Sequence, residues 1–158
     1  MLILNTNKTN NNMENKNTLA KEVDIVFMAR RIRILGIAIL LGIILVYGLG
    51  LFVSGSYINE ELSGFKIVSF IICVAFCIPS FFLKKFMLKS LNEKNFIGKY
   101  FNAHLIPFAM CDLGGLFCIV TNMFVNSNIV YATAGFLIAV AFMILNFPRS
   151  DDYTKLKV

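Results

Sequence analysis

The chain has 158 residues, of which 58% are hydrophobic and 15% are charged, and it carries a formal net charge of +6. Soluble domains contain about 45–50% apolar and about 25% charged residues, so one small soluble core cannot hide this apolar excess. The composition therefore excludes an ordinary soluble domain and indicates a membrane protein.

The N-terminal part of the chain is more polar than the rest and divides into two segments. Residues 1–17 are rich in Asn and are expected to form a disordered tail. Residues 18–33 place Leu19, Val23 and Phe27 at helical spacing beside basic residues. This pattern predicts a cytoplasmic amphipathic helix that lies at the membrane interface and leads into the first apolar segment.

Four apolar segments follow, and each is long enough to cross a bilayer. A spanning helix needs about 20 apolar residues, and in lipid a helix satisfies its own backbone hydrogen bonds. The chain is therefore predicted to be all-α, with residues 34–158 forming a polytopic bundle of four transmembrane helices. The predicted spans are residues 34–53, 67–83, 101–125 and 129–147.

Basic residues are distributed unevenly between the two sides of these spans. All Lys and Arg residues except Lys66 lie before the first span, between the second and the third, or after the fourth. Because cytoplasmic loops carry an excess of Lys and Arg, both termini are predicted to be cytoplasmic, in the inner membrane of a bacterium. We assign the positive charge to contact with anionic lipid headgroups, made by Lys84, Lys85 and Lys89, and not to nucleic acid.

Small residues recur where packed helices require them. Gly42 in the first span and Gly135 in the fourth each belong to a small-x-x-x-small pair, and Gly114 and Gly115 are adjacent in the third. Such residues let helix backbones approach closely. We expect these glycines at helix contacts, either inside the bundle or between the subunits of a homo-oligomer or a larger membrane complex.

One carboxylate, Asp112, lies in the middle of the third span. A charged side chain at the bilayer centre costs about 2.5–3.5 kcal/mol on insertion scales, which makes it a functional candidate by default. Ser80, or the Ala75 carbonyl that Pro79 frees, lies at a suitable depth to accept a hydrogen bond from it. His104 is a candidate proton relay toward Asp112. Two interpretations stay open: a hydrogen bond that fixes helix register, or a site that binds an ion or a proton.

The cysteines do not have the spacing of a metal site. His104, Cys111 and Cys118 are seven residues apart on one helix face, which separates neighbours by about 10.5 Å along the axis. Zn–S bonds are about 2.3 Å long, so one ion cannot bind two of these side chains. The cysteines are expected to pack as small apolar residues, with Cys73 and Cys118 at compatible depths for a disulfide. No metal or other cofactor is expected.

The third span also resembles part of a known family. Residues 109–120, AMCDLGGLFCIV, are similar to the carboxylate helix of subunit c, the proteolipid of the rotary ATP synthase. This resemblance implies that Asp112 corresponds to the ion-binding acid, and Gly115 and Leu116 to the Gly-Leu that follows it. The chain departs from that family because its acid lies in the third of four spans and no span has closely spaced glycines.

A second resemblance covers the whole chain. In its length, its acid-containing third span and the Phe147-Pro148-Arg149 sequence that ends the fourth, it resembles a group of small four-span bacterial membrane proteins. Since that group has no established function, the resemblance implies a fold and a location only.

The sequence contains no motif that indicates an enzyme, and the polar connections between the spans are too short for a catalytic domain. We therefore expect a non-enzymatic protein with a structural or accessory role in a membrane complex. Two alternatives stay open: a small proton- or cation-coupled transport component that uses Asp112, and an immunity-type membrane protein.

Overall fold

The computed structural model describes residues 3–53, 64–91, 96–149 and 152, with side chains described from Val26 in the first helix and from Ile97 in the third. These ranges are helical and contain no strand. The elements are α1 (Ile3–Val53), α2 (Phe65–Lys89), α3 (Phe96–Val120), the π-helical turn η3 (Thr121–Val125) and α4 (Ile129–Asn146).

Four stretches of the described helices are long and apolar enough to cross a membrane. They are Val26–Val53, Phe65–Lys89, Ile97–Val125 and Ile129–Asn146. The prediction of an all-α chain with four such helices is therefore confirmed. The first three stretches extend beyond the predicted spans, because Lys, Arg and their polar neighbours continue a helix readily after the apolar run ends. The side of the membrane that holds the termini stays a prediction.

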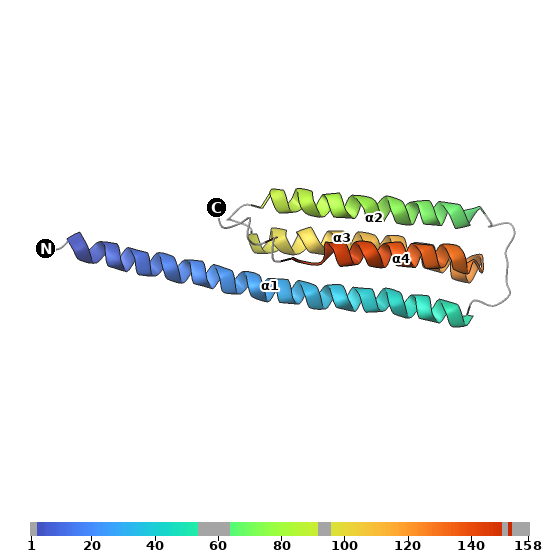
Figure 1. Cartoon of the computed structure of the whole chain (residues 1–158), viewed down its shortest axis with the longest axis horizontal. Helices are drawn as coiled ribbons and strands as arrows, with labels where there is room; N and C mark the ends of the chain where they lie inside the picture. The colour runs from blue at the N-terminus through green and yellow to red at the C-terminus, as the bar shows by residue number, and fades with distance from the viewer. Residues whose placement is uncertain (1–2, 54–63, 92–95, 150–151, 153–158) are drawn as a thin grey trace.

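α1 differs from the sequence expectation at its N-terminus. The sequence predicts disorder over residues 1–17 and a separate helix over 18–33, whereas the backbone of α1 is helical from Ile3 without a break. Its N-terminal part extends past the ends of the other helices (Figure 1). Helix propagation from turns that have already formed costs little per residue, which accounts for the continuous helix. The side chains before Val26 lie outside the described part, so the interfacial face stays a prediction.

The helices are arranged around α3. It packs against α1, α2 and α4, while α4 also contacts both α2 and α1. Figure 1 shows α2 on one side of the α3–α4 pair and α1 on the other. Because α3 has neighbours on several sides, half of its span is buried, whereas α1 and α2 present most of their apolar side chains outward. Outward apolar side chains on this scale fit a lipid surrounding.

Three of the four glycines predicted at helix contacts lie at close approaches. An added Cβ at Gly114 would lie 3.2 Å from the Cys73 backbone of α2. One at Gly115 would lie 2.6 Å from the Ala139 Cβ of α4 and 2.7 Å from Ile43 of α1. These contacts leave no room for a side chain, so α3 can approach α1, α2 and α4 closely only because it carries adjacent glycines.

The other two predicted glycines differ from each other. A Cβ at Gly135 of α4 would lie 2.9 Å from Cys118 Cβ, so it also lies at a close contact. Gly42 is exposed, and a Cβ there would meet nothing within 4 Å among the described residues. The expectation for Gly42 is therefore wrong within this bundle. The close contacts of α1 are made by two other glycines: Gly36, where a Cβ would lie 2.9 Å from the Phe108 ring, and Gly50, where it would meet the Met123 side chain.

A compact connection joins α3 to α4. The π-helical turn η3 continues α3 to Val125, and the Asn126 N–H donates to the Thr121 carbonyl at 3.2 Å. Ser127 has a φ of 48°, and the Asn128 side chain caps α4 by accepting from the Tyr131 N–H at 3.2 Å. The polar Asn126-Ser127-Asn128 sequence that ends the third predicted span therefore supplies both the turn and the helix cap.

Candidate functional site

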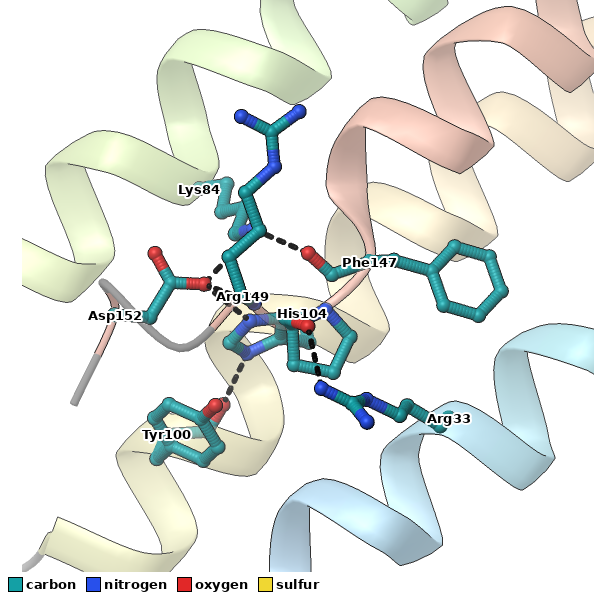
Figure 2. Close-up of polar contacts among 8 residues, drawn as sticks. Arg33, Lys84, Tyr100, His104, Phe147, Arg149 and Asp152 are labelled. Atoms are coloured by element: carbon teal, nitrogen blue, oxygen red, sulfur yellow. Dashed lines mark hydrogen bonds and ion pairs between the residues drawn. The ribbon is translucent and has the colours of Figure 1, made fainter.

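Charged and polar side chains from three helices meet the chain that follows α4 at one end of the bundle (Figure 2). We call this group the C-terminal cluster. Its members are Arg33 of α1, Lys84 of α2, Tyr100 and His104 of α3, and Phe147, Pro148, Arg149 and Asp152 after α4.

The Asp152 carboxylate lies at the centre of the C-terminal cluster. Its Oδ2 atom is 3.2 Å from Lys84 Nζ and 3.6 Å from His104 Nε2. The same atom accepts a hydrogen bond from the Arg149 backbone N–H at 3.0 Å. Burial raises the pKa of Asp152, but the interactions with His104, Arg149 and Lys84 outweigh it and hold that pKa below its ordinary value. Asp152 is therefore ionised at neutral pH.

Lys84 is buried, with 5% of its surface exposed. Besides its ion pair with Asp152, its ammonium group donates to the Phe147 carbonyl oxygen at 3.0 Å. The expected contact of Lys84 with lipid headgroups is therefore wrong, because a carboxylate and a carbonyl of this chain replace the headgroup. Lys85 and Lys89 are exposed, so their contact with headgroups stays a prediction.

His104 is also part of this cluster. It is fully buried, its Nδ1 lies 3.0 Å from the Tyr100 carbonyl oxygen, and its ring packs at 4.6 Å from the Tyr100 ring. The sequence suggests a relay from His104 to Asp112, but eight residues of α3 separate them, which is about 12 Å along the axis. The structure instead brings His104 to Asp152 and Lys84, neither of which the sequence singled out as its partner.

Ser80 belongs to a second polar group, buried between α2, α3 and α4. Its hydroxyl lies 2.6 Å from the Cys77 carbonyl and 3.1 Å from Cys111 Sγ. Asn146 of α4 donates to the Ser80 oxygen at 3.0 Å. The hydrogen bond expected from Asp112 to Ser80 is therefore replaced by contacts with Cys111 and Asn146. Sequence reasoning missed Asn146, although an amide near the end of an apolar span is a recognisable signal.

A third buried polar group lies near the other end of the spans. Asn122 Nδ2 donates to the Ser69 hydroxyl at 2.8 Å and to the Cys118 carbonyl at 2.9 Å. The Cys73 and Cys118 thiols donate to carbonyl oxygens of α4 at 3.7 and 3.5 Å. Together these bonds link α2, α3 and α4, and they give Cys73 and Cys118 a role beyond the apolar packing expected from the sequence.

The four cysteines are free and buried. Cys73 and Cys118, which the sequence places at compatible depths for a disulfide, are both thiols in this structure. In the described part of the chain, His, Cys, Asp and Glu side chains do not form a group of three that can hold a metal ion. The thiols act as weak hydrogen-bond donors and small apolar side chains in the core.

Asp112 occupies a different position from all of these groups. It is half-buried, and among the described residues no hydrogen bond or ion pair involves its carboxyl group. Successive helix residues point about 100° apart, so Cys111 and Gly114 face α2 while Asp112 is rotated away from it. One turn away on either side, Phe108 and Gly115 contact α1. Asp112 therefore lies at the outer edge of the α1–α3 contact, beside the outward-facing Leu113.

Comparisons of the chain with protein-family models, with curated proteins and with solved structures find no match. The resemblance to subunit c therefore depends only on the residues of the third span quoted above.

Proposed function

We propose that this chain is a multi-pass protein of the bacterial inner membrane with both termini in the cytoplasm. We further propose that it is a non-enzymatic accessory subunit of a membrane complex, in which Asp112 binds a transmembrane helix of a partner. The cytoplasmic side is assigned from the basic residues that flank the spans.

The observation that carries this proposal is the position of Asp112. The buried polar side chains Ser80, Asn122 and Asn146 are each hydrogen-bonded to a neighbouring helix. The Asp112 carboxyl has no such bond in the part of the chain that the structure describes, and it lies at the outer edge of the bundle. A carboxyl group that makes no bond to the described bundle is available to a partner outside it.

The energetic cost supports an external partner. A charged residue at the centre of a lone spanning helix costs about 2.5–3.5 kcal/mol on insertion scales. Internal hydrogen bonds would offset that cost, but Asp112 makes none to the residues that the structure describes. A donor such as Lys, Arg, Ser or Asn on a neighbouring transmembrane helix would satisfy the carboxyl, as polar residues between membrane helices do. α1 offers none, because its span opposite Asp112 is entirely apolar.

Site-specific photo-crosslinking in native membranes tests the proposal. A photoreactive residue replaces Leu113, which is 61% exposed beside Asp112, or Ile71, which is 59% exposed on α2. Both positions are equally accessible, but only Leu113 lies next to the proposed contact. We expect a discrete crosslinked adduct at Leu113, none at Ile71, and loss of the Leu113 adduct when Asp112→Leu is added.

Two outcomes would contradict the proposal. One is an absence of any protein adduct at Leu113, and the other is an adduct that persists unchanged in Asp112→Leu. Circular dichroism and size-exclusion profiles of the purified variant show whether Asp112→Leu keeps its fold. The mass of the adduct distinguishes a second copy of this chain from a different subunit.

A proton- or cation-coupled transport component is the second candidate. It is favoured by the half-buried position of Asp112, which leaves its carboxyl accessible from outside the bundle. In reconstituted protein, a carbodiimide should then modify Asp112, a specific cation should protect it, and Asp112→Asn should abolish ion flux into liposomes. Lack of modification at every pH tested between about 6 and 9 would exclude this candidate.

A further inference from the structure

His104 of α3 and Asp152 form a contact that the Asp112 proposal does not use. The described residues that follow α4, which are Phe147, Pro148, Arg149 and Asp152, are called the C-terminal turn. We propose that the pair of His104 and Asp152 is a proton-binding site, and that docking of the C-terminal turn on the bundle takes up one proton. The proposal depends on the C-terminal cluster alone and requires no partner protein.

The two ring nitrogens of His104 face groups that determine their protonation. Nδ1 lies 3.0 Å from the Tyr100 carbonyl oxygen. A carbonyl oxygen only accepts hydrogen bonds, so Nδ1 must carry a hydrogen and donate it. Nε2 lies 3.6 Å from Asp152 Oδ2. In a neutral ring with its hydrogen on Nδ1, Nε2 would direct a lone pair at the carboxylate, with no donor between them.

Burial makes the neutral arrangement costly. His104 is fully buried, and its Nε2 has no hydrogen-bond partner within the described ranges. A buried acceptor that faces an anion is destabilised both by its lost hydration and by repulsion. One added proton removes both penalties, because an imidazolium ring donates from both nitrogens and pairs with the carboxylate. The docked pair therefore holds one more proton than the separated neutral His104 and ionised Asp152.

The cationic neighbours of the pair decide where that proton resides. Lys84 of α2 contacts the same Oδ2 atom at 3.2 Å, and the Arg149 N–H donates to it at 3.0 Å. Both interactions favour an ionised Asp152, so the proton resides on His104. The Lys84 charge also repels the imidazolium, and the carboxylate between them compensates for this repulsion.

The remaining groups around the pair come from α1, from α3 and from Arg149, whose positive charge acts on Lys84. The Arg33 guanidinium donates to the Pro148 carbonyl at 3.4 Å, so it binds the backbone of the turn and not the carboxylate. Tyr100 contributes its carbonyl oxygen and its ring, which lies 4.6 Å from the His104 ring. The C-terminal turn is thus attached by proton-independent contacts from Arg33 and Lys84, and by one proton-dependent contact from His104.

Proton uptake gives docking a defined pH dependence. As the pH rises, the docked pair loses its proton and docking weakens, because the docked state binds more protons than the released state. As the pH falls far enough to protonate Asp152, the ion pairs with Lys84 and His104 are lost and docking weakens again. Docking is therefore strongest at mildly acidic pH.

The test uses the full chain in lipid nanodiscs, purified with a tag that lacks His. His104 is the single His of the sequence, so ¹⁵N labelling of imidazole gives one pair of ring-nitrogen signals. Near pH 6.5, where an unperturbed imidazole is half neutral, we expect both nitrogens to be protonated in the wild type. In Asp152→Asn at the same pH, we expect Nε2 to be largely unprotonated. Asp112→Asn makes the same substitution about 12 Å from His104 along α3 and should match the wild type.

Amide hydrogen exchange of Arg149 and Asp152, corrected for the intrinsic pH dependence of exchange, measures docking directly. We expect protection that falls several-fold between about pH 6 and 8 in the wild type, across the range in which His titrates. His104→Gln cannot bind a proton, so its protection should be the same at both pH values. An unprotonated Nε2 in a wild type with a protected turn would overturn the proposal, as would equal protonation in wild type and Asp152→Asn.

Discussion

Two carboxyl groups, Asp152 in the C-terminal cluster and Asp112 at the edge of α3, show two ways in which an apolar chain accommodates an acid. Asp152 is held by Lys84, His104 and the Arg149 N–H, contributed by two helices and its own turn. Asp112 is half-buried and makes no hydrogen bond or ion pair within the described residues. The first acid is a component of the fold, whereas the second lies at the outer edge of the bundle.

The position of an acid in the middle of a predicted span therefore does not show that this acid stabilises the bundle. Asp112, in the middle of a span, is the more conspicuous residue, yet its removal leaves no unpaired group behind in the described bundle. Asp152 follows the last helix, and its removal leaves Lys84 buried without its counter-charge. An uncompensated buried charge is among the most destabilising changes that a single substitution produces.

The largest effect is expected from removal of the cation that holds Asp152. Lys84→Ala should lower the free energy of unfolding by about 2–3 kcal/mol, because it breaks a largely buried ion pair. Lys85→Ala is the matched control, since Lys85 is exposed and lies 4.2 Å above the Phe81 ring. It should change stability by no more than about 0.5 kcal/mol. Unfolding in mixed detergent micelles measures both, and equal effects would remove the distinction between the two lysines.

An acid-dependent loss of stability should belong to Asp152. Its pKa is lowered in the folded state, so its contribution is present above the unfolded value of about 3.9 and is lost as the pH falls through the folded pKa. Because Asp152 is partly exposed, we expect only about 1 kcal/mol between pH 5 and the acid limit. Stability curves of the wild type and Asp152→Asn should converge at low pH. Curves that stay parallel would contradict this assignment.

Asp112→Leu should have a smaller effect on the isolated chain, and of the opposite sign. No internal hydrogen bond is broken in the described bundle, and an apolar side chain replaces an acid, so stability in micelles should rise by up to about 1 kcal/mol. Asp152→Leu, the same change in the C-terminal cluster, should lower stability. A clear loss of stability in purified Asp112→Leu would place the partner of this acid inside the chain and remove the main support for an external one.

The smallest expected quantity is the coupling between Ser80 and Asp112. A double-mutant cycle of Ser80→Ala and Asp112→Leu should give an interaction energy near zero, because Ser80 bonds to Cys77, Cys111 and Asn146. The cycle of Ser80→Ala with Asn146→Leu should give about 0.6 kcal/mol, a typical value for a hydrogen bond between membrane helices. A similar interaction energy in both cycles would show that Asp112 interacts with Ser80 and would contradict this prediction.

The four helices were predictable because they depend on the length and composition of apolar segments, which can be read directly from the sequence. Runs of about 20 apolar residues and adjacent small residues require no knowledge of partners, so the four helices and the close contacts at Gly114, Gly115 and Gly135 follow from the sequence. Gly42 makes no contact inside the described bundle, because a small residue permits a contact without supplying the neighbour, and its contact between subunits stays a prediction. On α1 such neighbours lie at Gly36, beside the Phe108 ring, and at Gly50, beside Met123.

The site was less predictable, for two physical reasons. Asp112 and Ser80 lie at similar depths in the predicted membrane, which suggested that they face each other. The direction in which a side chain points from its helix decides its partner, and at that depth Cys111, not Asp112, points toward Ser80 of α2. This error was avoidable, because the 100° step per residue is known from the sequence. The burial of Lys84 was not predictable in this way. It depends on how the chain turns after Pro148, which brings Asp152 back over α2 and α3.

The central position of α3 has a consequence for biogenesis. If the four apolar helices enter a membrane in chain order, α1 and α2 enter first, yet in the finished bundle their described residues pack mainly on α3 and α4 and not on each other. The nascent hairpin therefore has little to hold it together before the second half of the protein is inserted. The bundle can therefore assemble only after α3 is inserted, because its adjacent glycines Gly114 and Gly115 allow α1 and α2 to pack closely against it. A pause or truncation of translation before Gly114 should leave two independent spans exposed to membrane quality control.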